Sequence, residues 1–187
     1  MIQSVNGLIN PVRSAIGMKA PGASGQLGQA VVARFKNEYN CIPVPREEVP
    51  RVDQVFGLLH IAGAFTLGST VDDFAKMIDA NLMSGVRAIE AVREKISEGG
   101  RIVAIGSIAS LTKPSGLAAY VAAKSALNAY IEVLAKELQK QHITVNALLP
   151  STLGPDGVPH ERVTAAIAFL LSEDASPISG QLIAMTA

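Results

Sequence analysis

Residues 101–124, with the sequence RIVAIGSIASLTKPSGLAAYVAAK, contain the pattern that decides the fold. Residues 101–106 are an apolar run of strand length, and a helical pattern extends over residues 117–139. A continuous apolar run is typical of a strand buried on both faces, so this run predicts a strand of a parallel sheet. A buried strand followed by a long helix is the repeating unit of an α/β fold.

The same alternation continues along the chain. We expect further strands over residues 15–20, 41–44, 55–62, 143–149 and 181–185, and helices over residues 29–36, 70–96 and 161–171. Pro43 in the 41–44 segment favours an edge strand, and Gly99-Gly100 are expected to end the 70–96 helix. The predicted fold is a doubly wound parallel sheet with helices on both faces. We expect residues 1–187 to form one domain.

Composition excludes several classes of partner. The chain has 16 basic and 16 acidic residues and no basic run, which argues against nucleic acid and anionic membranes. No apolar stretch approaches the ~20 residues of a membrane span. The single cysteine, Cys41, cannot form an internal disulfide, so we expect a cytoplasmic protein. No His or Cys spacing is typical of a metal site.

A glycine-rich loop precedes the first predicted helix. Gly22, Gly25 and Gly28 follow a weak strand pattern, and glycines at such a position permit a tight turn and close approach of the backbone to a pyrophosphate. This spacing alone is weak evidence, since glycine turns are common. Arg46, eighteen residues after Gly28 (46 − 28), is placed to hold the 2′-phosphate of NADP. The alternative is a solvated arginine beside Glu47 and Glu48.

Tyr120 and Lys124 carry the chemistry of the opening stretch. Residues four apart lie on one face of a helix, where a lysine ammonium stabilises a phenolate and lowers a tyrosine pKa from ~10 toward neutrality. Ser107, at the end of the predicted strand, could share a substrate oxygen with that phenol. Ser110 is a rival, but it lies three residues beyond. The alternative is an ordinary helix face without chemistry.

Together these motifs resemble the short-chain dehydrogenase/reductase family. Ala62-Gly63 is similar to the end of its Asn-Asn-Ala-Gly motif, and Tyr120 follows Ser107 by the family's usual thirteen residues (120 − 107). The resemblance implies a Rossmann-type fold, and a catalytic tetrad of Asn81, Ser107, Tyr120 and Lys124. In it, Lys124 would lower the Tyr120 pKa and bind the nicotinamide ribose, and Asn81 would connect Lys124 to solvent through a water.

The resemblance also implies a cofactor site and partners. The expected cofactor is NADP, with NAD as the alternative, and the expected substrate is a small carbonyl or alcohol. Family members pair helices across dimer axes, and the alanine-rich helix around Tyr120 suggests a homodimer or homotetramer. The implied cofactor-binding residues are Gly22, Ser24, Gly25, Gln26, Leu27, Gly28, Arg46, Ala62, Gly63, Tyr120, Lys124, Pro150, Thr152 and Leu153.

Some features resemble the dihydropteridine-reductase-like branch, among them the glycine spacing and the segment 149–153, but Ser107 does not fit that enzyme. The chain also departs from the family. The unit after the second strand is missing or shortened, His60 replaces an asparagine, and the segment after Pro150 is short. Either the protein is a pared-down member or segments are absent at these two places.

Three functions remain open on the sequence. The leading one is an NAD(P)-dependent oxidoreductase with tyrosine as the general acid and base. The second is a redox-inactive nucleotide-binding or scaffold protein of the same fold. The third is an isomerase or dehydratase with a tightly held cofactor.

Overall fold

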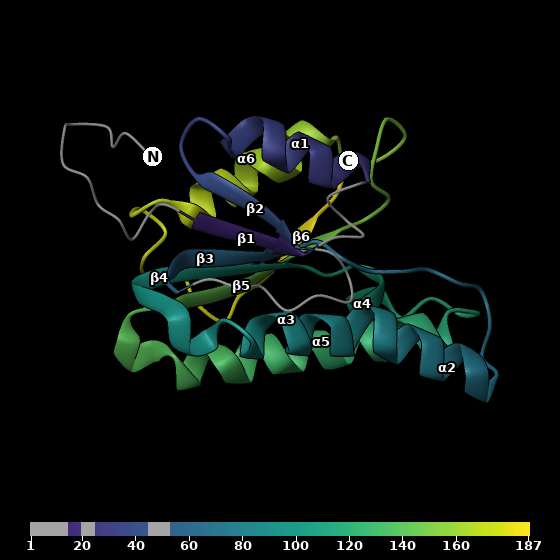
Figure 1. Cartoon of the computed structure of the whole chain (residues 1–187). Coiled ribbons are helices and arrows are strands. Elements are labelled where there is room, and N and C mark those ends of the chain that lie inside the picture. Colours follow the sequence, from purple (N-terminus) through teal and green to yellow (C-terminus); the bar gives the residue numbers. More distant parts are fainter. Residues whose placement is uncertain (1–14, 20–24, 45–52) are drawn as a thin grey trace.

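A computed structural model describes residues 15–19, 25–44 and 53–187. Its six strands form one parallel sheet with the order β2-β1-β3-β4-β5-β6 (Figure 1). The strands are β1 Ala15–Lys19, β2 Asn40–Val44, β3 Val55–His60, β4 Ile96–Ile105, β5 Thr144–Pro150 and β6 Leu182–Met185. The α-helices are α1 Gln26–Phe35, α2 Val71–Ile78, α3 Ser84–Glu90, α4 Ala109–Thr112, α5 Ala118–Glu137 and α6 His160–Leu171.

The strand order confirms the predicted doubly wound sheet. β2 lies on one side of β1, while β3 and its successors extend from the other side, so the order reverses between β1 and β3. Only ten residues (55 − 44 − 1) separate the end of β2 from the start of β3. A connection of this length has no room for a further helix–strand–helix unit, which agrees with the shortening expected after the second strand. β2 is an edge strand, as Pro43 predicts.

Helices cover both faces of the sheet (Figure 1). α1 and α6 lie on one face, and α2, α3 and α5 lie on the other. Because successive side chains of a strand point to opposite faces, β4 contributes Ile102 to the core under α3 and α5, and Val103 to the core under α1 and α6. The near-continuous burial of β3, β4 and β5 follows from this two-sided packing. No helix among the described residues is long and apolar enough to cross a membrane.

The predicted helix over residues 70–96 is shorter than expected. It begins as predicted, with Thr70 and Asp73 forming a capping box, but α3 ends at Glu90, and the strand begins at Ile96. Gly99-Gly100 therefore lie inside β4 and do not end the helix. Gly99 has a φ of +73°, and a Cβ at Gly100 would lie 2.6 Å from Phe56 O. The glycine pair instead permits the shift in register between β3 and β4.

The fold brings the predicted site segments to one edge of the sheet. The loops that follow β3, β4 and β5 all leave the carboxyl ends of parallel strands. Ala62-Gly63 follow β3, Ser107 follows β4, and Pro150 ends β5. In open α/β sheets this edge, next to the point where the strand order reverses, is where ligands bind.

Candidate active site

One face of α5 contacts the end of β4 and the segment that follows it. Tyr120 and Lys124 lie four residues apart on this helix, as the sequence predicts. The Ser107 side chain lies close enough to the Tyr120 hydroxyl to lower the pKa of that hydroxyl. Lys124 Nζ donates a hydrogen bond to Ile105 O at 3.0 Å. The structure therefore brings Ser107, Tyr120 and Lys124 together at the carboxyl end of the central strand β4.

The electrostatics of Tyr120 differ from the expectation. Burial raises the pKa of Tyr120 above its usual value of 10.0, and the Ser107 side chain opposes that rise. Lys124 does not contribute to this shift, contrary to the prediction that it lowers the Tyr120 pKa. The Lys124 ammonium instead donates a hydrogen bond to the carbonyl of Ile105. Ser107 is the residue that moves the Tyr120 pKa toward neutrality here.

Lys124 is itself deeply buried. Only 4% of its surface is exposed, and burial lowers the pKa of Lys124 from 10.5 to about 8. A buried ammonium is unfavourable because water no longer solvates its charge, and Ile105 O replaces only part of that solvation. The protonation state of Lys124 therefore changes close to physiological pH.

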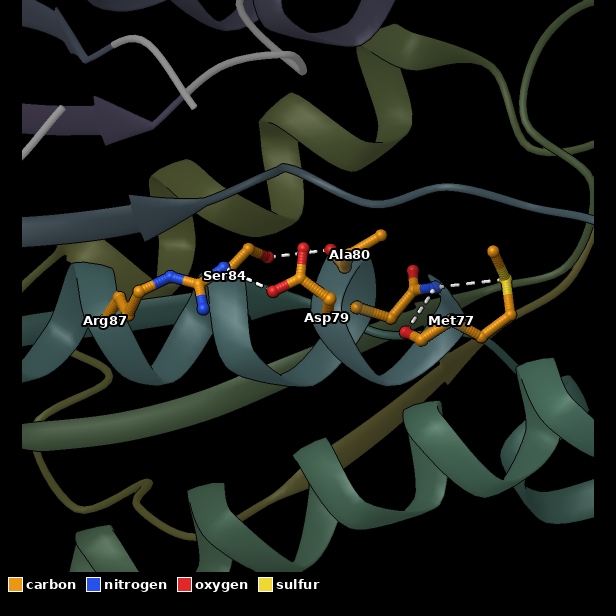
Figure 2. Close-up of polar contacts among 6 residues, drawn as sticks. Met77, Asp79, Ala80, Ser84 and Arg87 are labelled. Atoms are coloured by element: carbon orange, nitrogen blue, oxygen red, sulfur yellow. Dashed lines mark hydrogen bonds and ion pairs between the residues drawn. The ribbon is translucent and has the colours of Figure 1, made fainter. Parts of the chain in front are cut away.

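Asn81 lies in a π-helical segment, Asp79–Met83, between α2 and α3. The wider turn is seen in the bond from Ser84 N to Asp79 O, five residues back (84 − 79). Figure 2 shows this stretch, where Ser84 Oγ donates to Ala80 O and Arg87 pairs with Asp79. Such π segments are rare in proteins, and those that do occur often lie at functional sites. The irregularity coincides with the predicted catalytic asparagine.

The Asn81 side chain is fully buried and holds the loop after β3. Its Oδ1 accepts from Ala64 N at 3.1 Å, and its Nδ2 donates to Ala64 O at 2.9 Å and to Met77 O at 3.2 Å. Met77 O is the carbonyl that the backbone of residue 81 would use in a regular α-helix. The polar atoms of the Asn81 side chain therefore form hydrogen bonds with backbone groups, and these bonds fix the position of Gly63 and Ala64.

Gly63 lies between the side chains of Asn81 and Lys124. A Cβ at residue 63 would lie 2.8 Å from Asn81 Oδ1 and 3.2 Å from Lys124 Nζ. Both distances are shorter than ordinary van der Waals contacts, so only glycine fits without moving one of these polar groups. Gly63 therefore allows three parts of the site, from β3, the π-helical segment and α5, to approach closely.

We expect Gly63→Ala to lower the free energy of unfolding by about 1–3 kcal/mol, because the added methyl group overpacks a polar contact. Urea denaturation at neutral pH measures the change. In an Asn81→Ala background, where Oδ1 is absent, the same substitution should be less costly. Equal costs in the two backgrounds would contradict the proposed contact.

The other predicted cofactor residues fall in three places: the start of α1, the ends of β3 and β5, and the parts of the chain outside the described residues. Gly25 is the N-cap of α1, Leu27 and Gly28 are buried, and Gln26 is exposed at the start of this helix. Ala62 is buried, Pro150 O accepts from Ile108 N at 3.1 Å, and Thr152 and Leu153 are exposed beyond β5. Gly22, Ser24 and Arg46 lie outside the described residues.

Phe65 is a site residue that the sequence analysis missed. Its ring packs edge-on against Tyr120, with 5.1 Å between the ring centroids and 77° between the planes. The side chain is 59% exposed, although it is large and apolar. The sequence feature that could have indicated Phe65 is its position two residues after Gly63. Among the described residues, no group of three His, Cys, Asp or Glu side chains is placed to hold a metal.

Sequence comparison gives both a family match and individual relatives. A family model described as short chain dehydrogenase matches residues 46–162. The 3-oxoacyl-[acyl-carrier-protein] reductase of Mycobacterium tuberculosis is 30% identical over an alignment of 146 positions, which covers 65% of this chain and 59% of that reductase. An oxidoreductase of Methylorubrum extorquens is 26% identical, and the match covers 91% of this chain and 77% of that protein.

Solved structures share the fold over nearly the whole chain. A blue fluorescent protein from a metagenomic library, solved with NADPH, has a TM-score of 0.81 at 20% identity, covering 94% of this chain and 97% of its own. BdcA, also solved with NADPH, has a TM-score of 0.80 at 22% identity and covers 93% of each chain. At these identities the likeness is one of fold.

Proposed function

Because this chain belongs to the short-chain dehydrogenase family, we propose that it is an NADP-dependent reductase of a small carbonyl compound, with Tyr120 as its general acid and base. The observation that carries the proposal is the placement of the Ser107 side chain beside the Tyr120 hydroxyl, with Lys124 one helical turn away on α5. These three residues lie at the ligand-binding edge of a doubly wound sheet. A tyrosine hydroxyl in this setting is suited to exchange a proton with a carbonyl or carbinol oxygen.

The residues at the start of α1 suit a dinucleotide. Gly25 caps this helix without a side-chain hydrogen bond, and the first turn contains no acidic residue. The N–H groups of the first turn and the positive end of the helix therefore suit a pyrophosphate. Lys124 and Gly63 would adjoin the ribose and the nicotinamide, and when bound the nicotinamide supplies the hydride.

The protein side of the reaction is a proton transfer at one oxygen. In the reduction direction, Tyr120 donates its proton to the substrate oxygen while Ser107 holds that oxygen by a hydrogen bond. Lys124, with a pKa of about 8, can hold a positive charge near the developing phenolate. The exposed ring of Phe65 beside Tyr120 offers the substrate an apolar wall.

The preference for NADP over NAD rests on Arg46, because a guanidinium recognises a 2′-phosphate by bidentate hydrogen bonds. The substrate is proposed only as a class, a small carbonyl or the corresponding alcohol. Relatives named as reductases support the carbonyl group as the reacting centre.

Titration of the purified protein with NADPH and with NADH, followed by the fluorescence of the reduced nicotinamide, tests the proposal. We expect tighter binding of NADPH, and oxidation of NADPH by at least one compound in a panel of ketones and aldehydes, measured by absorbance. Failure to bind either dinucleotide would favour the redox-inactive scaffold. NAD that is retained through purification, without net turnover, would favour the isomerase or dehydratase.

A further inference from the structure

Three residues of α5 at regular spacing contact the end of β4 and the turn after it. Tyr120, Lys124 and Asn128 are each four residues apart, so they form one line along the helix. Tyr120 contacts Ser107 and Lys124 contacts Ile105. The third member, Asn128, is outside the predicted tetrad, and its Nδ2 donates to Ser110 Oγ at 2.8 Å.

Ser110 in turn forms hydrogen bonds with the backbone of Ser107. Its hydroxyl donates to Ser107 O at 2.6 Å, and its backbone N–H donates to the same carbonyl at 3.1 Å. The hydroxyl therefore accepts from Asn128 and donates to Ser107, which uses both capacities of one group. Ser110 and Asn128 are 4% and 5% exposed, so neither bond competes with bulk water. Ser125 Oγ adds a longer bond to Ser110 O at 3.4 Å.

Packing alone does not explain why residue 128 is an asparagine. Asn128 Oδ1 is buried and has no hydrogen-bond partner among the described residues. An unsatisfied buried acceptor is destabilising, whereas a leucine of similar size would avoid it. The amide is therefore best explained by what its Nδ2 group does, which is to orient the hydroxyl of Ser110.

We propose that Asn128 and Ser110 are positioning residues, which hold the backbone of Ser107 so that its hydroxyl meets Tyr120. The two residues do not touch the reacting atoms, and they act through Ser107. The inference rests on the proposed function for its catalytic consequence. The structural part of the inference is that Ser110 affects the pKa of Tyr120, and this effect can be measured without turnover.

Ser110→Ala is the first test. Loss of the hydroxyl leaves Ser107 less well placed, and misplacement of a reacting group lowers kcat by about ten- to a hundredfold. The KM for NADPH should stay unchanged. Because the Ser107 side chain lowers the pKa of Tyr120, its displacement raises that pKa. In alcohol oxidation, where Tyr120 must be deprotonated, the rising limb of the pH–rate profile should shift to higher pH. Asn128→Leu should give a smaller effect in the same direction.

Thr164→Val is the matched control. Thr164 Oγ1 also donates to a backbone carbonyl three residues back, Glu161 O at 3.0 Å, and is buried in α6 on the opposite face of the sheet. This variant should lose stability without any shift of the pH profile. In a Ser107→Ala background, Ser110→Ala should cause no further loss of kcat, because the residue through which it acts is gone.

Two results would overturn the proposal. One is a Ser110→Ala protein with an unchanged pH profile, and the other is a loss of kcat that adds fully to that of Ser107→Ala. If the parent turns over no substrate, the proposed function fails, but ultraviolet titration of tyrosinate still measures the Tyr120 pKa, with Tyr120→Phe subtracted. An unchanged pKa in Ser110→Ala would then refute the positioning role by itself.

Discussion

Tyr120→Phe should lower kcat by at least about 100-fold, which is the lower range of what a positioned general acid contributes. The substitution removes the only group we assign to donate the proton, and it keeps the ring that packs against Phe65. NADPH affinity should therefore remain nearly that of the parent. Steady-state kinetics with an active carbonyl compound, together with a fluorescence titration of NADPH, separate these two effects.

Tyr130→Phe is the matched control for this experiment. Tyr130 lies on the same helix, and its hydroxyl donates to Glu90 Oε1 at 2.6 Å, away from Ser107. Its loss should reduce stability slightly and leave kcat close to that of the parent. If Tyr120→Phe retained activity within about tenfold of the parent, well under the usual contribution of a general acid, the assignment of Tyr120 would be wrong.

Lys124→Met should abolish most turnover and also change how stability depends on pH. In the folded protein burial lowers the pKa of Lys124 to about 8, whereas an unfolded lysine has a pKa of ~10.4. Between these values the unfolded chain binds more protons, so the stability of the parent rises with pH. From pH 7 to pH 10, the parent should gain about 2–3 kcal/mol relative to Lys124→Met.

Urea denaturation of both proteins at the two pH values measures this difference. Methionine leaves Ile105 O without its donor at both pH values, because a neutral lysine amine also donates, so this cost cancels in the comparison. Lys136→Met, which removes an exposed ammonium from the last turn of the same helix, should retain the pH dependence of the parent. Parallel pH dependence of the parent and Lys124→Met would refute the buried-ammonium interpretation.

The sequence predicted those parts of the site that depend on local spacing. Tyr120 and Lys124 share a helix face because they are four residues apart, and Ser107 follows a strand because an apolar run ends there. The parallel sheet follows from the same alternation of patterns. Each of these features is set by neighbours along the chain, which is why the residues alone indicate them.

Features that depend on contacts distant in sequence were not predictable. Burial of Tyr120 raises its pKa, against the expectation, and the bond from Lys124 to Ile105 O exists only because α5 packs on the end of β4. Gly99-Gly100 looked like a helix end, but they serve a shift in strand register that β3 imposes. Asn128 was missed, although its spacing of four from Lys124 is a visible signal once its partner is known.

The π-helical segment at Asp79–Met83 also constrains how the chain can vary in length. It acts as a one-residue insertion between two regular helices. Because one wider turn takes up the extra residue, deleting one residue there would restore α-helical hydrogen bonding while α3 keeps nearly the same face toward the sheet. Met77 on α2 and Ile89 on α3 are both buried, and both would stay in their cores. A one-residue deletion within the regular turns of α3 would instead rotate the residues after it by about 100° and expose part of that core.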